Sequence, residues 1–260
     1  MNIRNPNQEI VQPDKYQLLP HKVTAKSVDY AGGSTPKHNH IRAQLIYAAS
    51  GVMRIETDEG CWVVPPLRGV WIPPKVMHTV HILNQVEMRT LYIRPDIAAT
   101  LAPHCCLVEV SPLLRSLIIS LTEEETDYDE NGRAGLIAQL VLLEIKFLRT
   151  PALHLPLPSN PKLMQVCQQM LKSPDENFTL ELLADQMAMS TRTLARKFEK
   201  ETGLNFSQWR QQAKLIEALS KLADQQSIAK VASDLGYLSS SAFTAMFKRV
   251  LGVEPSKYFK

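Results

Sequence analysis

The spacing of apolar residues changes partway along the chain. From about residue 16 to residue 95 the apolar positions form short runs rich in β-branched and aromatic side chains. Turn residues such as Ser50-Gly51 and Asp58-Glu59-Gly60 separate these runs, which cover residues 45–47, 52–56, 61–64, 70–72, 79–83 and 88–93. Short strands at close spacing with turn signals predict a small antiparallel sandwich or barrel.

After Pro103 the apolar residues take a helical period. Ser111-Pro112 is a cap followed by a proline in the first turn, and it predicts a helix with apolar positions 113, 114, 117, 118 and 121. A second helix is predicted over 133–149, with an apolar stripe wider than one packed face needs. Such a helix is either buried on two sides or shared with a second subunit. Residues 150–161 hold four prolines and predict a semi-extended linker.

The last hundred residues contain an internal duplication. Residues 179–187 align with 227–235 at an offset of 48, and 190–198 align with 239–247 at an offset of 49. The single-residue shift falls in a turn, where insertions usually collect. Each copy predicts a helix-turn-helix in which a hydroxyl residue caps each helix and an alanine lies where the helices approach closely. These residues are Thr179, Ala184 and Ser190 in the first copy, and Ser227, Ala232 and Ser239 in the second. Residues 206–222 predict one amphipathic helix that fixes the separation of the copies.

Composition and charge narrow the class of protein. The 260 residues are 45% hydrophobic and 21% charged, which is ordinary for a globular chain with room for two domains. Residues 160–260 carry 14 Lys+Arg against 10 Asp+Glu, a net +4, whereas the remainder carries 15 against 16, a net −1. This weakly indicates a polyanionic partner. No run of about 18 apolar residues and no apolar leader is visible, and the four cysteines lack paired spacing. We therefore expect a cytoplasmic protein that does not bind membranes.

Residues 161–258 resemble the DNA-binding domain of AraC/XylS-type bacterial regulators. The most specific part runs from Ile228 through Gly236-Tyr237, continues over 239–247, and ends with Gly252-Val253-Glu254-Pro255-Ser256-Lys257-Tyr258. The resemblance implies two recognition helices that enter successive major-groove segments of double-stranded DNA, about one helical turn apart.

By the same resemblance, the base-facing residues are Arg192, Ala195 and Arg196 in the first copy and Ser240, Ser241, Thr244 and Ala245 in the second. Either arginine could read guanine bidentately, so the first recognition helix is the expected specificity determinant. The second offers hydroxyls and methyls, which suit phosphate or thymine contacts. The caps leave amide donors near Ser190, Thr191 and Ser239. Lys197, Lys200, Lys248 and Arg249 are either phosphate contacts or solvated side chains.

Two segments of the N-terminal half resemble the cupin motifs. They are residues 33–51, which contain His38, His40 and Gln44, and residues 69–78, which end at His78. The first three share an even spacing and are expected on one strand face, with His78 joining them across a barrel mouth. The metal-binding cupin motif has a glutamate where this chain has Gln44, and a neutral amide is a poorer ligand. The site is therefore expected to hold either a divalent transition metal or an organic effector.

Together these features predict an α+β chain of two domains. A cupin-like barrel (1–103) precedes a helical dimerisation region (104–150), a Pro-rich linker (151–160) and a double helix-turn-helix domain (161–260). The predicted function is a homodimeric, sequence-specific transcriptional regulator that responds to a small-molecule or metal effector and is not an enzyme. The alternative is a cupin-type metal-dependent enzyme with a helical appendage, against which the duplicated helix-turn-helix argues. The sequence predicts no certain cofactor.

Overall fold

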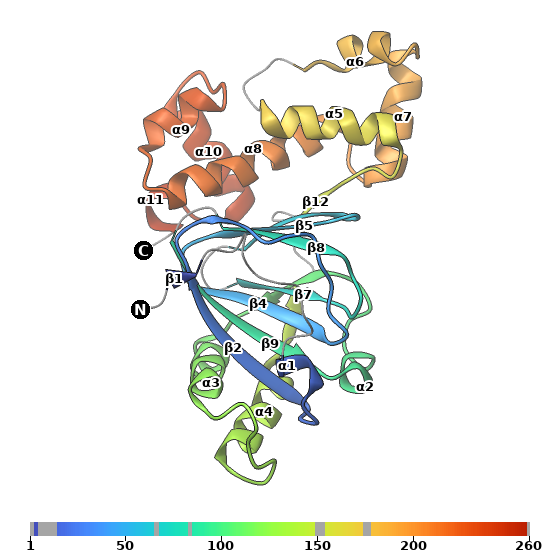
Figure 1. Cartoon of the computed structure of the whole chain (residues 1–260). Helices are drawn as coiled ribbons and strands as arrows, with labels where there is room; N and C mark the ends of the chain where they lie inside the picture. Colours follow the sequence, from blue (N-terminus) through green and yellow to red (C-terminus); the bar gives the residue numbers. More distant parts are fainter. Residues whose placement is uncertain are drawn as a thin grey trace. The chain divides into compact units, whose positions relative to one another are not determined.

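The computed structural model describes residues 3–4, 15–64, 68–82, 85–148, 154–173 and 178–258. The chain divides into two compact units: Met1–Thr57 with Val64–Thr150, and Asp58–Val63 with Pro151–Lys260 (Figure 1). The first unit is rich in β-strands and the second is mostly helical, which confirms the predicted two-domain α+β class. Among the described residues, no helix is long and apolar enough to cross a membrane.

The strands of the first unit belong to two sheets. Seven described strands form one sheet, in the order β1 (Ile3–Arg4), β2 (Val23–Tyr30), β9 (Val86–Ile93), β4 (Ala43–Ser50), β7 (Arg68–Ile72), β10 (Cys106–Glu109) and β11 (Lys146–Leu148). The second sheet contains the neighbouring strands β3 (Gly33–Ser34), β8 (His78–Ile82) and β5 (Met53–Thr57). All six strands predicted from the sequence are present, with bounds that differ by a few residues.

Strand β4 is covered on both faces, which explains its nearly continuous apolar sequence. One face carries Ala43, Leu45 and Tyr47, which belong to a core shared with helices α3 (Pro112–Glu123) and α4 (Arg133–Glu144). The opposite face carries Gln44 and Ile46, because side chains alternate along a strand. Gln44 pairs in register with Tyr92 on β9 and Ile72 on β7. The side chain of Gln44 therefore points away from the helices.

The helical region of the first unit differs in part from the prediction. Ser111 caps α3 as expected, because its hydroxyl accepts a hydrogen bond from Leu114 N at 3.1 Å. However, α4 ends at Glu144 rather than at residue 149, and residues Lys146–Leu148 form β11. The expectation of continuous helical structure after Pro103 is also wrong, because Cys106–Glu109 forms β10 and pairs with both β7 and β11. Two single-turn helices, α1 (Lys15–Leu18) and α2 (Pro95–Ala98), complete the unit.

Part of the predicted linker is a strand. β12 (His154–Pro156) pairs antiparallel with β6 (Gly60–Val64), and the ring of His154 stacks on Trp62 with the centroids 4.4 Å apart. The other side of this strand is fixed to the helices, since the indole Nε1 of Trp209 donates to the carbonyl of Pro156 at 2.7 Å. Residues 150–153 of the predicted linker lie outside the described residues.

The rest of the second unit is helical, as predicted. The helices are α5 (Pro161–Lys172), α6 (Leu180–Gln186), α7 (Thr191–Thr202), α8 (Phe206–Ala223), α9 (Ile228–Asp234), α10 (Ser240–Leu251) and α11 (Pro255–Tyr258). All four predicted caps are formed: the hydroxyls of Thr179, Ser190, Ser227 and Ser239 each accept an amide hydrogen bond from the residue three positions on. The two helix-turn-helix units are thus α6–α7 and α9–α10, and α8 connects them (Figure 1).

The two turns differ at one matched position. Gly236 in the second turn has φ +70°, and its counterpart in the first turn is Ala188, with φ +52°. A left-handed backbone costs an alanine about 1–2 kcal/mol, while glycine adopts it freely. Ala188 is exposed, so replacing it removes few contacts.

We expect Ala188→Gly to stabilise the second unit by about 0.5–1 kcal/mol, because relief of strain exceeds the added entropy of the unfolded chain. Gly236→Ala should destabilise it by a similar or larger amount. Thermal unfolding of the full chain measures both. A lower melting temperature for Ala188→Gly would contradict the expectation.

Candidate histidine site and candidate recognition helices

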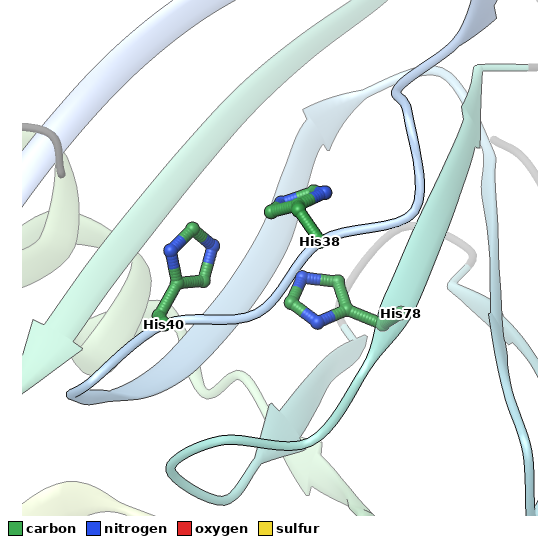
Figure 2. A group of neighbouring side chains, drawn as sticks. All are labelled: His38, His40 and His78. Carbon is green, nitrogen blue, oxygen red and sulfur yellow. The ribbon is translucent and has the colours of Figure 1, made fainter. Parts of the chain in front are cut away.

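Three histidine rings converge in the first unit. His38 and His40 come from the segment before β4, and His78 begins β8 (Figure 2). The ring centroids are 4.8 Å apart for His38 and His40, 4.4 Å for His38 and His78, and 5.3 Å for His40 and His78. One ligand nitrogen from each ring lies within 4.8 Å of the others. The predicted histidine cluster is therefore formed.

The backbone of this cluster differs from the sequence prediction. His38 and His40 do not lie on a strand, because β4 begins only at Ala43. Instead, His38 forms an isolated antiparallel bridge with His78, in which the two backbone N–H groups donate at 3.0 and 2.8 Å. The carbonyl of His40 accepts from Lys75 N at 2.7 Å. These bonds fix the loop where a regular strand was expected.

Two of the imidazoles are oriented by backbone carbonyls. Nδ1 of His38 lies 2.7 Å from the carbonyl of Pro36, and Nδ1 of His78 lies 3.0 Å from that of Val76. A carbonyl can only accept, so each Nδ1 carries a proton and each neutral ring has its lone pair on Nε2. Histidines that bind metals usually have this arrangement.

The third imidazole has the opposite tautomer. The amide oxygen of Gln17 accepts a hydrogen bond from Ile41 N at 2.9 Å, which leaves its amide nitrogen to face Nδ1 of His40 at 2.9 Å. Nδ1 of His40 is therefore the acceptor, and Nε2 carries the proton of the neutral ring. Gln17 lies 23 residues from His40 and outside both cupin-like segments, so no sequence motif pointed to it.

Burial keeps two of the rings uncharged. Desolvation lowers the pKa of His40 to about 3, with smaller contributions from His78, His38 and Lys26. Desolvation also lowers the pKa of His78 to about 4, with a smaller contribution from His38. Both imidazoles are therefore neutral at pH 7 and free of the proton that would exclude a metal or a donor group.

Gln44 belongs to the same neighbourhood. Its side chain lies on the same side of the sheet as that of Tyr92, its partner on the neighbouring strand β9. The Tyr92 ring contacts His40 edge-to-face, with the centroids 5.1 Å apart. The amide nitrogen of Gln44 is 3.4 Å from Thr90 Oγ1. Its Oε1, together with Nε2 of His40 and Nε2 of His78, is buried without a hydrogen-bond partner in the described part of the chain. Buried polar atoms are nearly always hydrogen-bonded in folded proteins, so a bound water, ion or ligand would account for these three.

The donor set fits some metals better than others. Three imidazoles and a neutral amide carry no formal charge, which suits zinc, nickel, cobalt or copper rather than magnesium or calcium. Two imidazoles on one such ion hold their ring centroids about 5 Å apart. The observed centroid separations, 4.4 to 5.3 Å, are close to this value.

Arg42 holds the segment that carries Gln17. Its guanidinium donates to the carbonyls of Gln17 at 3.0 Å and His21 at 2.7 Å, and also to that of Leu19. We call residues 16–23 the strap. Arg42 is buried, and burial lowers its pKa, but a guanidinium keeps its charge in proteins. The position of Gln17 therefore depends on a fixed charge.

The far end of the strap is attached to the loop between α3 and α4. Nε2 of His21 lies 2.8 Å from Asp127 Oδ1, and Nδ1 lies 3.2 Å from Glu130 Oε1. The imidazole also stacks on Tyr128 with a centroid separation of 4.2 Å. The hydroxyl of Tyr128 donates to the carbonyl of Val23. The strap thus contacts the histidine site at one end and the α3–α4 loop at the other.

In the second unit, α7 presents its predicted reading residues to solvent. Leu194 and Phe198 are buried and hold the helix against the unit. Arg192 and Arg196 lie on the exposed side, one turn apart, and Ala195 is partly exposed between them. Among the flanking cations, Lys200 is exposed and Lys197 is half-buried. This face can enter a major groove with both guanidinium groups available for base edges.

The second recognition helix, α10, is built in the same way. Phe243 and Phe247 are buried, whereas Ser241 and Ala245 are exposed and Ser240 and Thr244 are partly exposed. Lys248 pairs with Glu254 at 3.2 Å, so part of its charge is already neutralised within the domain. The α10 face therefore offers mainly hydroxyls and methyls. Besides Lys248, the last turn of α10 carries one other basic residue, Arg249.

Both units of the chain are similar to known proteins. The helix-turn-helix domain family matches residues 183–260, and the AraC-like ligand binding domain family matches residues 20–141. The HTH-type transcriptional regulator NimR of Escherichia coli (strain K12) is 37% identical over 250 residues, which cover 95% of this chain and 90% of that protein. The chain belongs to the AraC family of transcriptional regulators.

Other relatives are less similar. The arabinose operon regulatory protein of Escherichia coli (strain K12) is 25% identical over 143 residues, 54% of this chain and 48% of that protein. The crystal structure of the DNA-binding domain of AdpA in complex with a target DNA is 32% identical, with a TM-score of 0.36, and covers 39% of this chain and 91% of that one. This AraC-family member is accordingly a DNA-binding transcriptional regulator with a ligand-binding domain.

Proposed function

We propose that this regulator senses a small ligand held by His38, His40, His78 and Gln44, and that the ligand controls its binding to specific DNA sites. The observation that supports the proposal is the group of three buried polar atoms without partners, on His40, Gln44 and His78. Leaving such atoms unpaired costs about 1–3 kcal/mol each, which a bound ligand would recover. The regulator would act in the cytoplasm, where chromosomal DNA is accessible. An enzymatic role is not favoured, because the relatives are regulators.

The tautomers favour a polar organic effector. As they stand, His40 offers an N–H donor, while His78 and Gln44 offer acceptors, so a molecule with both kinds of group satisfies all three. A transition metal fits the ring separations equally well. However, it needs the Nε2 lone pair of His40, which moves the proton to Nδ1 against the amide of Gln17.

Metal analysis of the full chain, purified without a histidine tag, separates these two ligand classes. For an organic effector we expect far less than one equivalent of zinc, nickel, cobalt or copper per chain, and no rise after dialysis against zinc. One equivalent in the wild type, lost in His78→Ala, would assign the site to a metal instead.

The strap offers a route from the site to the helices. A ligand that binds to Nε2 of His40 changes the contact of this ring with Gln17. Gln17 lies near one end of the strap, and the other end contacts the α3–α4 loop. A ligand shifts an equilibrium only through different affinities for two states. We propose that these states differ in how the strap holds that loop.

We also propose that the protein is a homodimer through α4. Leu136, Leu140 and Leu143 are spaced as one stripe along the helix and are 57%, 47% and 78% exposed, and Leu113 on α3 is 53% exposed. A stripe of this kind on one helix face is typical of a covered surface. The wide apolar stripe predicted for this helix thus includes leucines that are exposed to solvent in the single chain.

We expect Leu140→Arg to convert the dimer to a monomer, because a charge would be buried among apolar side chains. Sedimentation of the full chain at tens of micromolar measures the change. Leu182→Arg is the matched control, because Leu182 on α6 is similarly exposed, at 55%. A wild-type chain that sediments as a monomer would contradict dimerisation.

A further inference from the structure

A groove in the second unit lies along α8, between the two helix-turn-helix units. Its volume is about 510 Å³. The lining comes from the start of α6, the first half of α8, the turn before α10, and α10 itself. The lining residues are Phe178, Thr179, Leu180, Phe206, Ser207, Arg210, Gln211, Lys214, Tyr237, Met246 and Arg249. Three of them are cations and none is acidic, so the groove favours an anion.

Aromatic rings and carbonyls hold two of these cations in place. Arg210 donates to the carbonyl of Phe178 at 2.6 Å, and its guanidinium lies 5.9 Å from the centroid of Phe206. Nζ of Lys214 donates to the carbonyl of Leu235 at 2.6 Å and lies 5.6 Å from the ring of Tyr237. Each side chain is thus positioned at the groove wall rather than extended freely into solvent.

The groove adjoins the face that reads DNA. Arg249 follows Ala245 by one helical turn on α10, so it continues the row of predicted base-facing residues toward the groove. On the other side, the groove reaches the start of α6, the first helix of its helix-turn-helix unit. In this motif the first helix crosses the DNA backbone. The groove therefore lies between two places where DNA is expected.

We propose that the groove binds the sugar-phosphate backbone of the DNA between the two major-groove segments. This inference rests on DNA binding by the chain. Recognition helices that enter successive major grooves leave an intervening stretch of backbone facing the helix that connects them. Lys214, Arg210 and Arg249 would neutralise phosphates there. Such contacts position the protein without reading sequence, and they release counterions.

Gln211 provides a test with little structural effect, since it lines the groove and is half-buried. Gln211→Lys should tighten, and Gln211→Glu should weaken, the binding of the full chain to operator and random duplexes alike. Lys214→Gln should weaken both by several-fold and reduce the slope of log K against log salt by about 0.9 per phosphate lost. Gln168→Glu, the same charge change on the exposed side of α5, should leave both unchanged.

The salt series separates a phosphate contact from a structural role. A variant that only loosens the fold would lower the melting temperature and leave the slope unchanged. Unchanged slopes in Lys214→Gln and both Gln211 variants, with sequence-specific binding intact, would overturn the groove proposal without affecting the proposed function.

Discussion

The double variant His40→Ala, His78→Ala is expected to bind its operator as the wild type does and to lose its response to the ligand. Both residues lie in the first unit, whereas the predicted reading faces of α7 and α10 lie in the second. Removing the two imidazoles deletes two of the three buried atoms that await a partner. Affinity for a ligand that contacts both should fall by about thirtyfold or more, at about 1–3 kcal/mol for each buried group left without its partner.

Operator binding by the purified full chain and induction of a reporter in cells measure the two properties separately. His104→Ala is the matched control, because His104 is exposed and lies outside the cluster. A melting curve should accompany the double variant, and His40→Asn provides a milder change if its stability falls. An unchanged response in a folded double variant would show that the histidines do not sense a ligand.

Replacing Arg196 by alanine is expected to weaken operator binding by about 1–3 kcal/mol, or roughly 5- to 150-fold, and to change binding to random DNA much less. Arg196 is exposed on α7, and the opposite side of the helix is fixed by Leu194 and Phe198. The side chain can therefore be removed without disturbing the fold. A bidentate contact to guanine accounts for the difference between the two DNAs.

Titrations with operator and random duplexes at one salt concentration measure this selectivity. Lys200→Ala is the control, since Lys200 is exposed near the end of α7 and is expected, at most, to touch phosphate. It should weaken both complexes by a similar factor. Equal losses for Arg196→Ala on the two duplexes would make Arg196 a phosphate contact as well.

The second unit could be predicted closely because several local signals agree there. Hydroxyl caps, helical periodicity and a duplicated pattern all indicate the same four helices, and the caps at Ser190 and Ser239 form as expected. Gly203 and Gly252 then end α7 and α10 in left-handed conformations, with φ +70° and +80°. Local interactions decide structure in short helices of this kind.

The first unit was harder because its short apolar segments are ambiguous. Ile145 is buried, Lys146 exposed and Phe147 half-buried, an alternation that suits β11, yet the same residues also continue the apolar stripe of a helix. Pairing with β10 decides the outcome, and this partner lies almost 40 residues earlier in the chain. Periodicity within one segment carries no information about such a partner.

The histidine site was only partly predictable for the same reason. The two cupin-like segments gave His38, His40 and His78, and these rings do converge. Neither the loop that carries His38 nor the amide of Gln17 follows from a motif. Gln17 reaches the site because Arg42 binds the carbonyls of the strap, which is a tertiary contact without a local signature.

Selection of bound duplexes from a random library by the full chain tests the central claim most directly. Because one connecting helix joins the two recognition helices, the selected duplexes should share a motif of two elements. The centres of these elements should lie about one helical turn, or 10 base pairs, apart. The element that contains a guanine should lose its preference at that base in Arg196→Ala. Recovery of no enriched motif, or of one that Arg196→Ala leaves unchanged at every position, would contradict sequence reading through α7.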